Sequence, residues 1–187
     1  MTGSSLIKEK IKLFIQGHYI ITRSFMYMIG HYDRYGNPFT QIVETDRTIF
    51  INKSPIEVLA YSLRCTGFTL DGAIESSKWI MKMDKMVPVV ANPYQEVILF
   101  PTRSLTHEDN IWFNPYQIRR TSNIKGKTLI ILSNHSSLYI PTRLTSFNTK
   151  IQTAEQLKKL TTEASNGTYM MVLEPEKRKE EKKTNNK

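Results

Sequence analysis

Short runs of apolar, strand-favouring residues separated by turn residues dominate the first third of the chain. Two such runs flank DRYGNP at residues 33–38, whose Gly-Asn-Pro sequence is strong turn chemistry. A third run, Thr48–Ile51, follows a polar break at residues 44–47. This pattern predicts a β-hairpin or a short meander between Tyr19 and Asn52.

Apolar residues recur at helical spacing in two segments after this hairpin. The first is SPIEVLAYSLRCTG at 54–67. Ser54 suits the N-cap, Pro55 suits the first turn, and Glu57 completes the spacing of a capping box. Gly67 suits the left-handed position after the C-terminus. A second helix is predicted over Leu70–Met81, with Thr69 or Asp71 near its start. Both helices are therefore expected directly after the meander.

Two further helices are predicted toward the ends of the chain. Ser5–Gln16 gathers its isoleucines and Phe14 on one face, with its lysines off that face. This segment is either a short helix lying on the domain or a membrane-surface anchor, and the first interpretation is favoured because the segment is short. The segment Thr153–Ala164 predicts a polar helix capped by its first residue, with Leu157 and Leu160 as its main apolar contacts.

The stretch VPVVANPYQEVILFPT, residues 87–102, holds three prolines around two short apolar runs. Pro88 and Pro93 confine Val89–Val90 to an edge or entry strand, because proline cannot donate a hydrogen bond to a sheet. Pro101 is expected to end a buried strand over Val97–Phe100. The stretch therefore predicts a rigid corner that orients neighbouring basic turns, and its prolines are not expected to be contact residues.

Three more strands are predicted between Ile111 and Leu144, with turns at 125–127 and 134–136. The expected fold class is α+β: mainly antiparallel β-sheet with a few short helices, forming a single domain plus a disordered basic tail. The predicted boundaries are an N-terminal helix or extension at 1–18, a folded domain at 19–165 and a charged flexible tail at 166–187.

Charge narrows the classes of partner. The chain has 26 Lys and Arg against 17 Asp and Glu, which gives a net charge of +9 and a pI near 9.6. The last 14 residues carry +2 of this charge, so +7 remains on the body. Such a basic body predicts a polyanionic partner, with nucleic acid ahead of an anionic membrane surface. A single cysteine and an N-terminus unlike a signal peptide favour the cytoplasm.

Candidate catalytic groups are sparse. The four histidines are scattered, and only His107-Glu108-Asp109 forms a dense polar cluster, which is more often a solvated loop than a metal site. Cys65 follows Arg64, so a lowered thiol pKa is conceivable, but a buried, small apolar residue is the favoured interpretation. The sequence therefore predicts no enzyme, no metal and no cofactor.

Basic residues at turns and strand ends are the remaining candidates for function. Such side chains reach a phosphate backbone while the strands stay packed, and arginine on a protruding loop enters a narrow, A/T-rich minor groove. The alternative is a solvated positive face that keeps the protein soluble. We expect about half of the following pool to approach DNA: Arg64, Lys78, Lys82, Arg103, Arg119, Arg120, Lys125, Lys127 and Arg143.

Several ordered motifs resemble the competence transcription factor family ComK of Gram-positive bacteria. They are Pro55 at a helix start, Arg64-Cys65 near its end, Gly67 and Gly72, Val87-Pro88-Val89, Phe100-Pro101-Thr102, Ile111-Trp112 and Ser146-Phe147. The resemblance covers about Tyr19 to Leu157, and the Phe-Pro-Thr strand with its upstream prolines is its most specific part.

This resemblance implies a transcriptional activator of competence genes that binds paired A/T-rich promoter boxes through the minor groove. It implies a homodimer or tetramer on double-stranded DNA, contact with RNA polymerase, and degradation through a MecA-type adaptor and a Clp protease. The implied location is the cytoplasm, in association with the nucleoid. Two alternatives remain: a truncated or divergent relative that binds DNA or the adaptor without activating, and an RNA-binding or nuclease-like enzyme.

Overall fold

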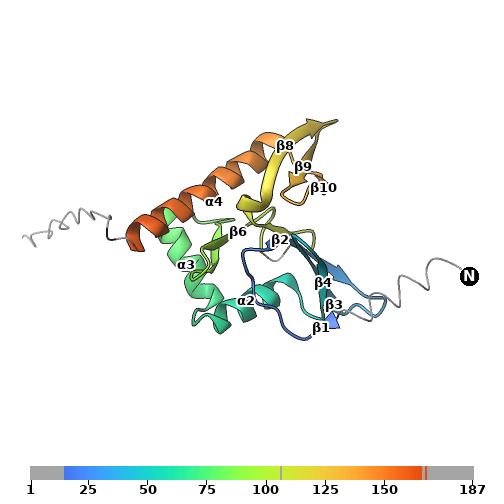
Figure 1. The fold of residues 1–187 in the computed structure, drawn as a ribbon, viewed down its shortest axis with the longest axis horizontal. Coiled ribbons are helices and arrows are strands. Elements are labelled where there is room, and N and C mark those ends of the chain that lie inside the picture. The colour runs from blue at the N-terminus through green and yellow to red at the C-terminus, as the bar shows by residue number, and fades with distance from the viewer. Residues whose placement is uncertain (1–14, 106, 166, 168–187) are drawn as a thin grey trace, which may run out of the picture.

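The computed structural model describes residues 15–105, 107–165 and 167. A seven-stranded sheet forms the middle layer, with helices α2 and α3 on one face and helix α4 and a second, three-stranded sheet on the other (Figure 1). The architecture confirms the predicted α+β class with mainly antiparallel strands.

The large sheet has the strand order β1-β4-β3-β2-β7-β6-β5, and every neighbouring pair except β1–β4 is antiparallel. Strands β2, β3 and β4 are the predicted meander, although β2 begins later than Tyr19. The bounds are β1 Ile15–Gln16, β2 Phe25–Tyr32, β3 Pro38–Glu44, β4 Thr48–Ile51, β5 Val89–Asn92, β6 Val97–Pro101 and β7 Ile111–Phe113.

The proline-bounded corner is confirmed as two short strands. Strand β5 lies at the edge of the large sheet, where the prolines on either side of it cost no ladder hydrogen bond. Strand β6 is buried along its whole length and ends at Pro101, one residue beyond the predicted range. The corner is thus a structural element that completes the sheet.

Helices α2, Pro55–Cys65, and α3, Leu70–Met81, match their predicted ranges. Ser54 caps α2, and its capping box with Glu57 is complete. Gly67 follows the last turn with φ +87°, a left-handed conformation that glycine adopts without steric cost. The caps explain why sequence alone located these two helices.

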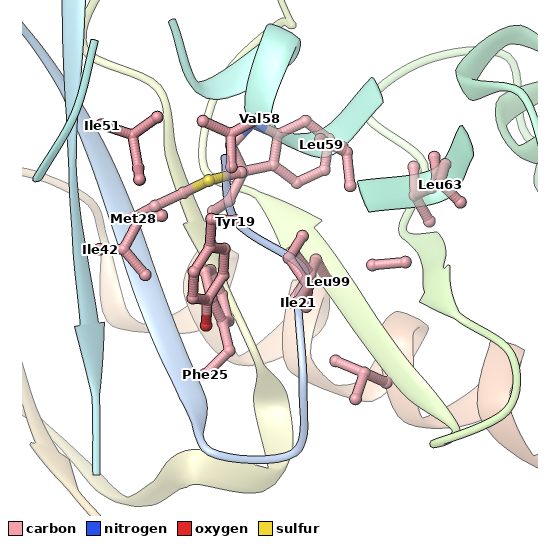
Figure 2. Close-up of a cluster of buried hydrophobic side chains, with 14 of the residues drawn as sticks. Tyr19, Ile21, Phe25, Met28, Ile42, Ile51, Val58, Leu59, Leu63 and Leu99 are labelled. Carbon is pink, nitrogen blue, oxygen red and sulfur yellow. The ribbon is translucent and has the colours of Figure 1, made fainter. Parts of the chain in front are cut away.

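The strands alternate their side chains between two apolar cores, one on each face of the large sheet. Figure 2 shows the core under α2, where Val58, Leu59 and Leu63 lie over side chains of the sheet such as Met28 and Ile42. The next residues along the strands point the other way. Val43, Ile98, Phe100 and Phe113 contribute to the second core, beneath α4 and the small sheet.

The first of the three predicted strands after Ile111 is interrupted, which corrects that part of the prediction. Asn114 is buried, and its side chain donates to the Phe25 carbonyl at 3.0 Å and accepts from the Tyr116 amide at 3.1 Å. With Pro115 it opens a short 3₁₀ helix, η1, Pro115–Gln117. The chain leaves the large sheet here and forms a separate sheet of β8 Ile118–Ile124, β9 Lys127–Leu132 and β10 Ser137–Ile140.

Helix α4 spans Leu144–Ser165 and begins nine residues before the predicted Thr153. Thr153 is not a cap: its hydroxyl donates to the Thr149 carbonyl at 2.8 Å inside the helix. The missed signal is the apolar stripe of Phe147, Ile151 and Ala154, which continues to Leu157 at helical spacing and packs on the second core.

The predicted helix Ser5–Gln16 is wrong at its end, because Ile15–Gln16 form β1 and pair in parallel with Phe50–Ile51 of β4. Residues 5–14 of that prediction, and the predicted tail at 166–187 except Gly167, lie outside the described residues. A two-residue strand gives no periodic signal of its own, so only its pairing with β4 reveals it.

A buried carboxylate links β3 to the segment before β2. Glu44 accepts hydrogen bonds from the Tyr19 hydroxyl at 2.7 Å and the Ser24 hydroxyl at 2.9 Å, and it pairs with Arg47. Burial raises the pKa of Glu44, but the hydrogen bonds from Arg47, Tyr19 and Ser24 lower it more, so its pKa is below the ordinary value of 4.5. The folded state therefore favours the ionised form.

We expect acid to weaken the protein through Glu44. Because its folded pKa is lowered, its contribution to the free energy of unfolding is complete above pH 4.5 and is lost as pH falls from there through the folded pKa. Urea denaturation between pH 7 and pH 3 measures this loss. Glu44→Gln should flatten the pH dependence, whereas Glu75→Gln, at an exposed position on α3, should leave it unchanged. Equal slopes in all three proteins would contradict the assignment.

Candidate nucleic-acid interface

The segment that builds the small sheet and the first half of α4 is free of acidic residues. Between Asn110 and Ala154 the chain has six Lys and Arg residues and no Asp or Glu, so this segment carries +6 of the total +9. The rest of the chain carries only +3. Most of the excess charge is therefore concentrated on one part of the fold.

The β8–β9 hairpin ends in a two-residue turn, Lys125-Gly126, in which both residues have positive φ, 51° and 79°. This is the geometry of a type I′ turn, and the Asn123 side chain supports it by accepting from the Gly126 amide at 3.1 Å. Lys127 follows as the first residue of β9. The turn thus places two lysines beside a glycine at the end of a narrow hairpin.

A third cation lies at the same end of the small sheet. Ile140, the last residue of β10, pairs with Thr128, and the Thr128 hydroxyl donates to the Thr142 carbonyl at 2.6 Å. Arg143 follows directly, and its carbonyl accepts the first helical hydrogen bond of α4 from the Phe147 amide. We call Lys125, Lys127 and Arg143 the basic tip; all three side chains are exposed.

The N-terminus of α4 adds to the positive potential of the basic tip. Backbone amides in a first helical turn point outward and carry partial positive charge, which favours phosphate groups. The first turn of α4 has no acidic residue that would offset this charge. Figure 1 shows the start of α4 beside the small sheet. The helix follows β10 after a short connection, and β10 pairs with β9 of that sheet.

The outer face of the small sheet combines cationic and apolar side chains. Directly paired residues share a face, so Arg120 lies beside Ile131, and Tyr139 lies beside Leu129. Tyr139 is 56% exposed and Ile124, next to the turn, is 38% exposed. Sequence reasoning identified Arg120 but not these two apolar side chains, because exposure depends on which face α4 covers.

The two arginines at the start of β8 differ in their surroundings. The register slips between Ile118 and Arg120, so Arg119 is the extra residue of a β-bulge. Its guanidinium lies 3.1 Å from Nδ1 of His135, which occupies the turn at the other end of β9. Arg119 is thus oriented by a partner and lies at the end of the small sheet away from the basic tip.

The four remaining candidates of the predicted pool lie outside the small sheet. Arg64 is in the last turn of α2, and Lys78 and Lys82 are at the end of α3, with acidic residues such as Glu75 and Asp84 nearby in the chain. Arg103 follows β6 and contacts His107 at 3.1 Å. Figure 1 shows α2 well separated from the small sheet, so Arg64 does not join the basic tip.

Lys150 is a cation of this segment that serves packing. Its ammonium donates to the Pro101 carbonyl at 3.2 Å and to the carbonyl of Thr102, which joins α4 to the end of β6. Burial, and then the charge of Arg103, lower the pKa of Lys150. Lys150 therefore stabilises the contact between α4 and the end of β6.

Among the described residues, no group of three His, Cys, Asp or Glu side chains is placed to hold a metal. Cys65 is exposed, so the favoured interpretation of a buried residue is wrong; it lies in the last turn of α2, on the face away from the core. No helix in the described part combines the length and apolarity needed to cross a membrane.

Comparisons with known proteins agree with the ordered motifs. A family model described as ComK protein matches residues 16–166. The competence transcription factor of Bacillus subtilis (strain 168) is 22% identical over 117 residues, which are 62% of this chain and 61% of that protein. The match thus spans about three fifths of that relative's length. No solved structure matches the chain significantly.

Proposed function

The chain belongs to the ComK protein family, and from that premise we propose that it is a competence transcription regulator that binds A/T-rich promoter DNA. The observation that carries this proposal is the basic tip on an acid-free segment of the fold. A hairpin that ends in lysines and glycine, beside an arginine and a helix N-terminus, suits a phosphate-lined groove.

We infer that the basic tip enters the minor groove. That groove is only about 6 Å wide and is narrowest and most negative in A/T-rich DNA. Gly126 has no side chain, which lets the backbone of the turn approach the groove floor, while the flanking lysines reach the phosphates of both strands. Ile124 and Tyr139 then face the sugars, where apolar contacts are favourable.

Family membership also motivates the proposed partners. Activation implies contact with RNA polymerase, and the family resemblance implies a MecA-type adaptor, a Clp protease and a homodimer or tetramer on promoter DNA. In this proposal the protein works in the cytoplasm, in association with the nucleoid, and is not an enzyme. Each partner requires its own binding measurement.

Gel-shift titration of the purified protein tests the central proposal. A duplex with A/T-rich boxes is compared with a G/C-rich duplex of the same length, over a series of salt concentrations. We expect tighter binding to the A/T-rich duplex and a linear fall of log affinity with log salt concentration. Equal affinity for the two duplexes would leave only non-specific binding to polyanions and would reject the proposal.

A further inference from the structure

A cavity of about 310 Å³ lies where the ends of β2 and β3 meet the start of α2 and the loop before β7. Gly30 forms part of its wall; a Cβ there would lie 3.1 Å from the ring of Pro55, so α2 approaches β2 closely at this point. Tyr32, Ile56 and Leu105 contribute apolar surface. A volume of this size is at the lower end for small-molecule sites.

Two buried donors in the wall have no partner among the described residues. Trp112 is fully buried and Asn110 is 3% exposed, and both line the cavity. The Asn110 side-chain oxygen accepts from the Arg103 amide at 3.0 Å, which leaves the Nδ2 hydrogens without an acceptor. The Trp112 Nε1–H likewise has none. The two residues are two positions apart, as expected for side chains on one side of an extended chain.

The chemistry of these two donors defines which ligand group could pair with them. An indole N–H and an amide NH₂ only donate, so each pairs with an acceptor oxygen or nitrogen. Buried donors without an acceptor are rare in folded proteins because they lose their hydrogen bonds to water. Both nitrogens are covered by their neighbours, and binding therefore requires a small shift of the side chains that line the cavity to admit an acceptor.

Charge around the cavity selects a neutral occupant. Glu108, an exposed residue, lines the cavity, and Asp109 follows it in the chain. The nearest cation of the same loop, Arg103, is directed toward His107. A carboxylate ligand would face this acidic edge with no Lys or Arg in the lining to bind it, whereas a carbonyl or amide oxygen carries no such penalty.

We propose that this cavity binds a small, mostly apolar and neutral molecule whose carbonyl oxygen accepts hydrogen bonds from Trp112 Nε1 and Asn110 Nδ2. The site is separate from the proposed DNA interface, because no residue of the basic tip or of β8, β9 and β10 lines it. The inference therefore stands or falls independently of DNA binding.

Nuclear magnetic resonance of the full chain with benzamide tests the proposal. Benzamide is neutral, planar and carries one carbonyl, and a fragment of its size is expected to bind on the order of millimolar. The Trp112 indole N–H signal should shift on titration. The signal of Trp79, which is 65% exposed on α3, is the internal control and should stay in place. Toluene, which has no acceptor, should not produce the downfield shift of the Trp112 N–H signal that a hydrogen bond causes.

Two variants separate the hydrogen bond from simple filling of the cavity. Trp112→Phe removes the donor, and its benzamide affinity, followed through the Ile56 methyl signals, should weaken about tenfold. Leu105→Trp fills the cavity and should abolish the shift of the Trp112 signal even if Trp112→Phe fails to fold. The proposal is overturned if benzamide leaves Trp112 unmoved, if Trp79 shifts equally, or if toluene produces the same shift.

Discussion

Replacing Phe147 with alanine is expected to lower the free energy of unfolding by about 3–5 kcal/mol, the range for deleting a buried aromatic ring. Phe147 is fully buried on α4. The centroid of its ring lies 5.5 Å from that of Phe100 in β6 and 5.4 Å from that of Phe113 in β7, and both contacts are edge-to-face. The same core holds Ile130 and Leu132 of the small sheet. Deleting the ring would therefore leave an empty space at the place where α4 packs on both sheets.

Chemical denaturation followed by circular dichroism measures this effect, with the unfolding midpoint and slope compared between variants. Phe68→Ala is the matched control, because Phe68 is 45% exposed and should cost much less. If the two variants lose similar stability, Phe147 does not hold the layers together as its contacts indicate. A Phe147→Leu variant keeps most of the volume and should recover part of the loss.

Neutralising the two lysines of the basic tip is expected to lower affinity for an A/T-rich duplex by roughly thirtyfold near physiological salt. The double variant Lys125→Gln, Lys127→Gln keeps polar side chains of nearly the same length but removes two charges that the proposal places on phosphates. Each lost phosphate contact should reduce the slope of log affinity against log salt by about 0.9, so the slope should fall by about 2. Gel-shift titration over a salt series measures both quantities.

The matched control removes two lysines of the same predicted pool from another part of the fold. Lys78→Gln, Lys82→Gln changes net charge by the same amount at the end of α3, outside the small sheet. Its affinity should fall much less than that of the basic-tip variant, since in the proposal these lysines contact no phosphate and attract the duplex only through longer-range interactions that salt screens. Equal losses in the two double variants would mean that total charge, and not the basic tip, drives binding.

Sequence alone anticipated the fold class and the elements whose signals are local. The α2 caps at Ser54, Glu57 and Gly67 need only neighbouring residues, and the same holds for the turn at Lys125-Gly126. The ordered motifs also led to the family that the comparison with known proteins confirms. The pool of basic residues predicted from the sequence includes all three cations of the basic tip, because these residues lie at turns and strand ends.

Elements that depend on distant partners were missed or misplaced. Asn114 breaks a strand because its side chain finds the Phe25 carbonyl, 89 residues away in the chain. Strand β1 exists through its pairing with β4, and α4 is extended to Leu144 because Phe147 packs on two sheets. Propensity describes what a segment prefers alone, and long-range contacts override it when they bury more surface.

What the sequence by itself determined was composition and local order: a basic chain, short capped helices, proline-bounded strands and cations at turns. Only the tertiary structure decided which cations come together, because β9 pairs with β8 on one side and β10 on the other, and so brings Arg143 to Lys125 and Lys127. The cavity beside Trp112 likewise exists only where β2, α2 and the loop before β7 meet. The physical reason is that charge and capping are carried by single residues and their neighbours, whereas surfaces and cavities arise from the packing of segments far apart in the chain.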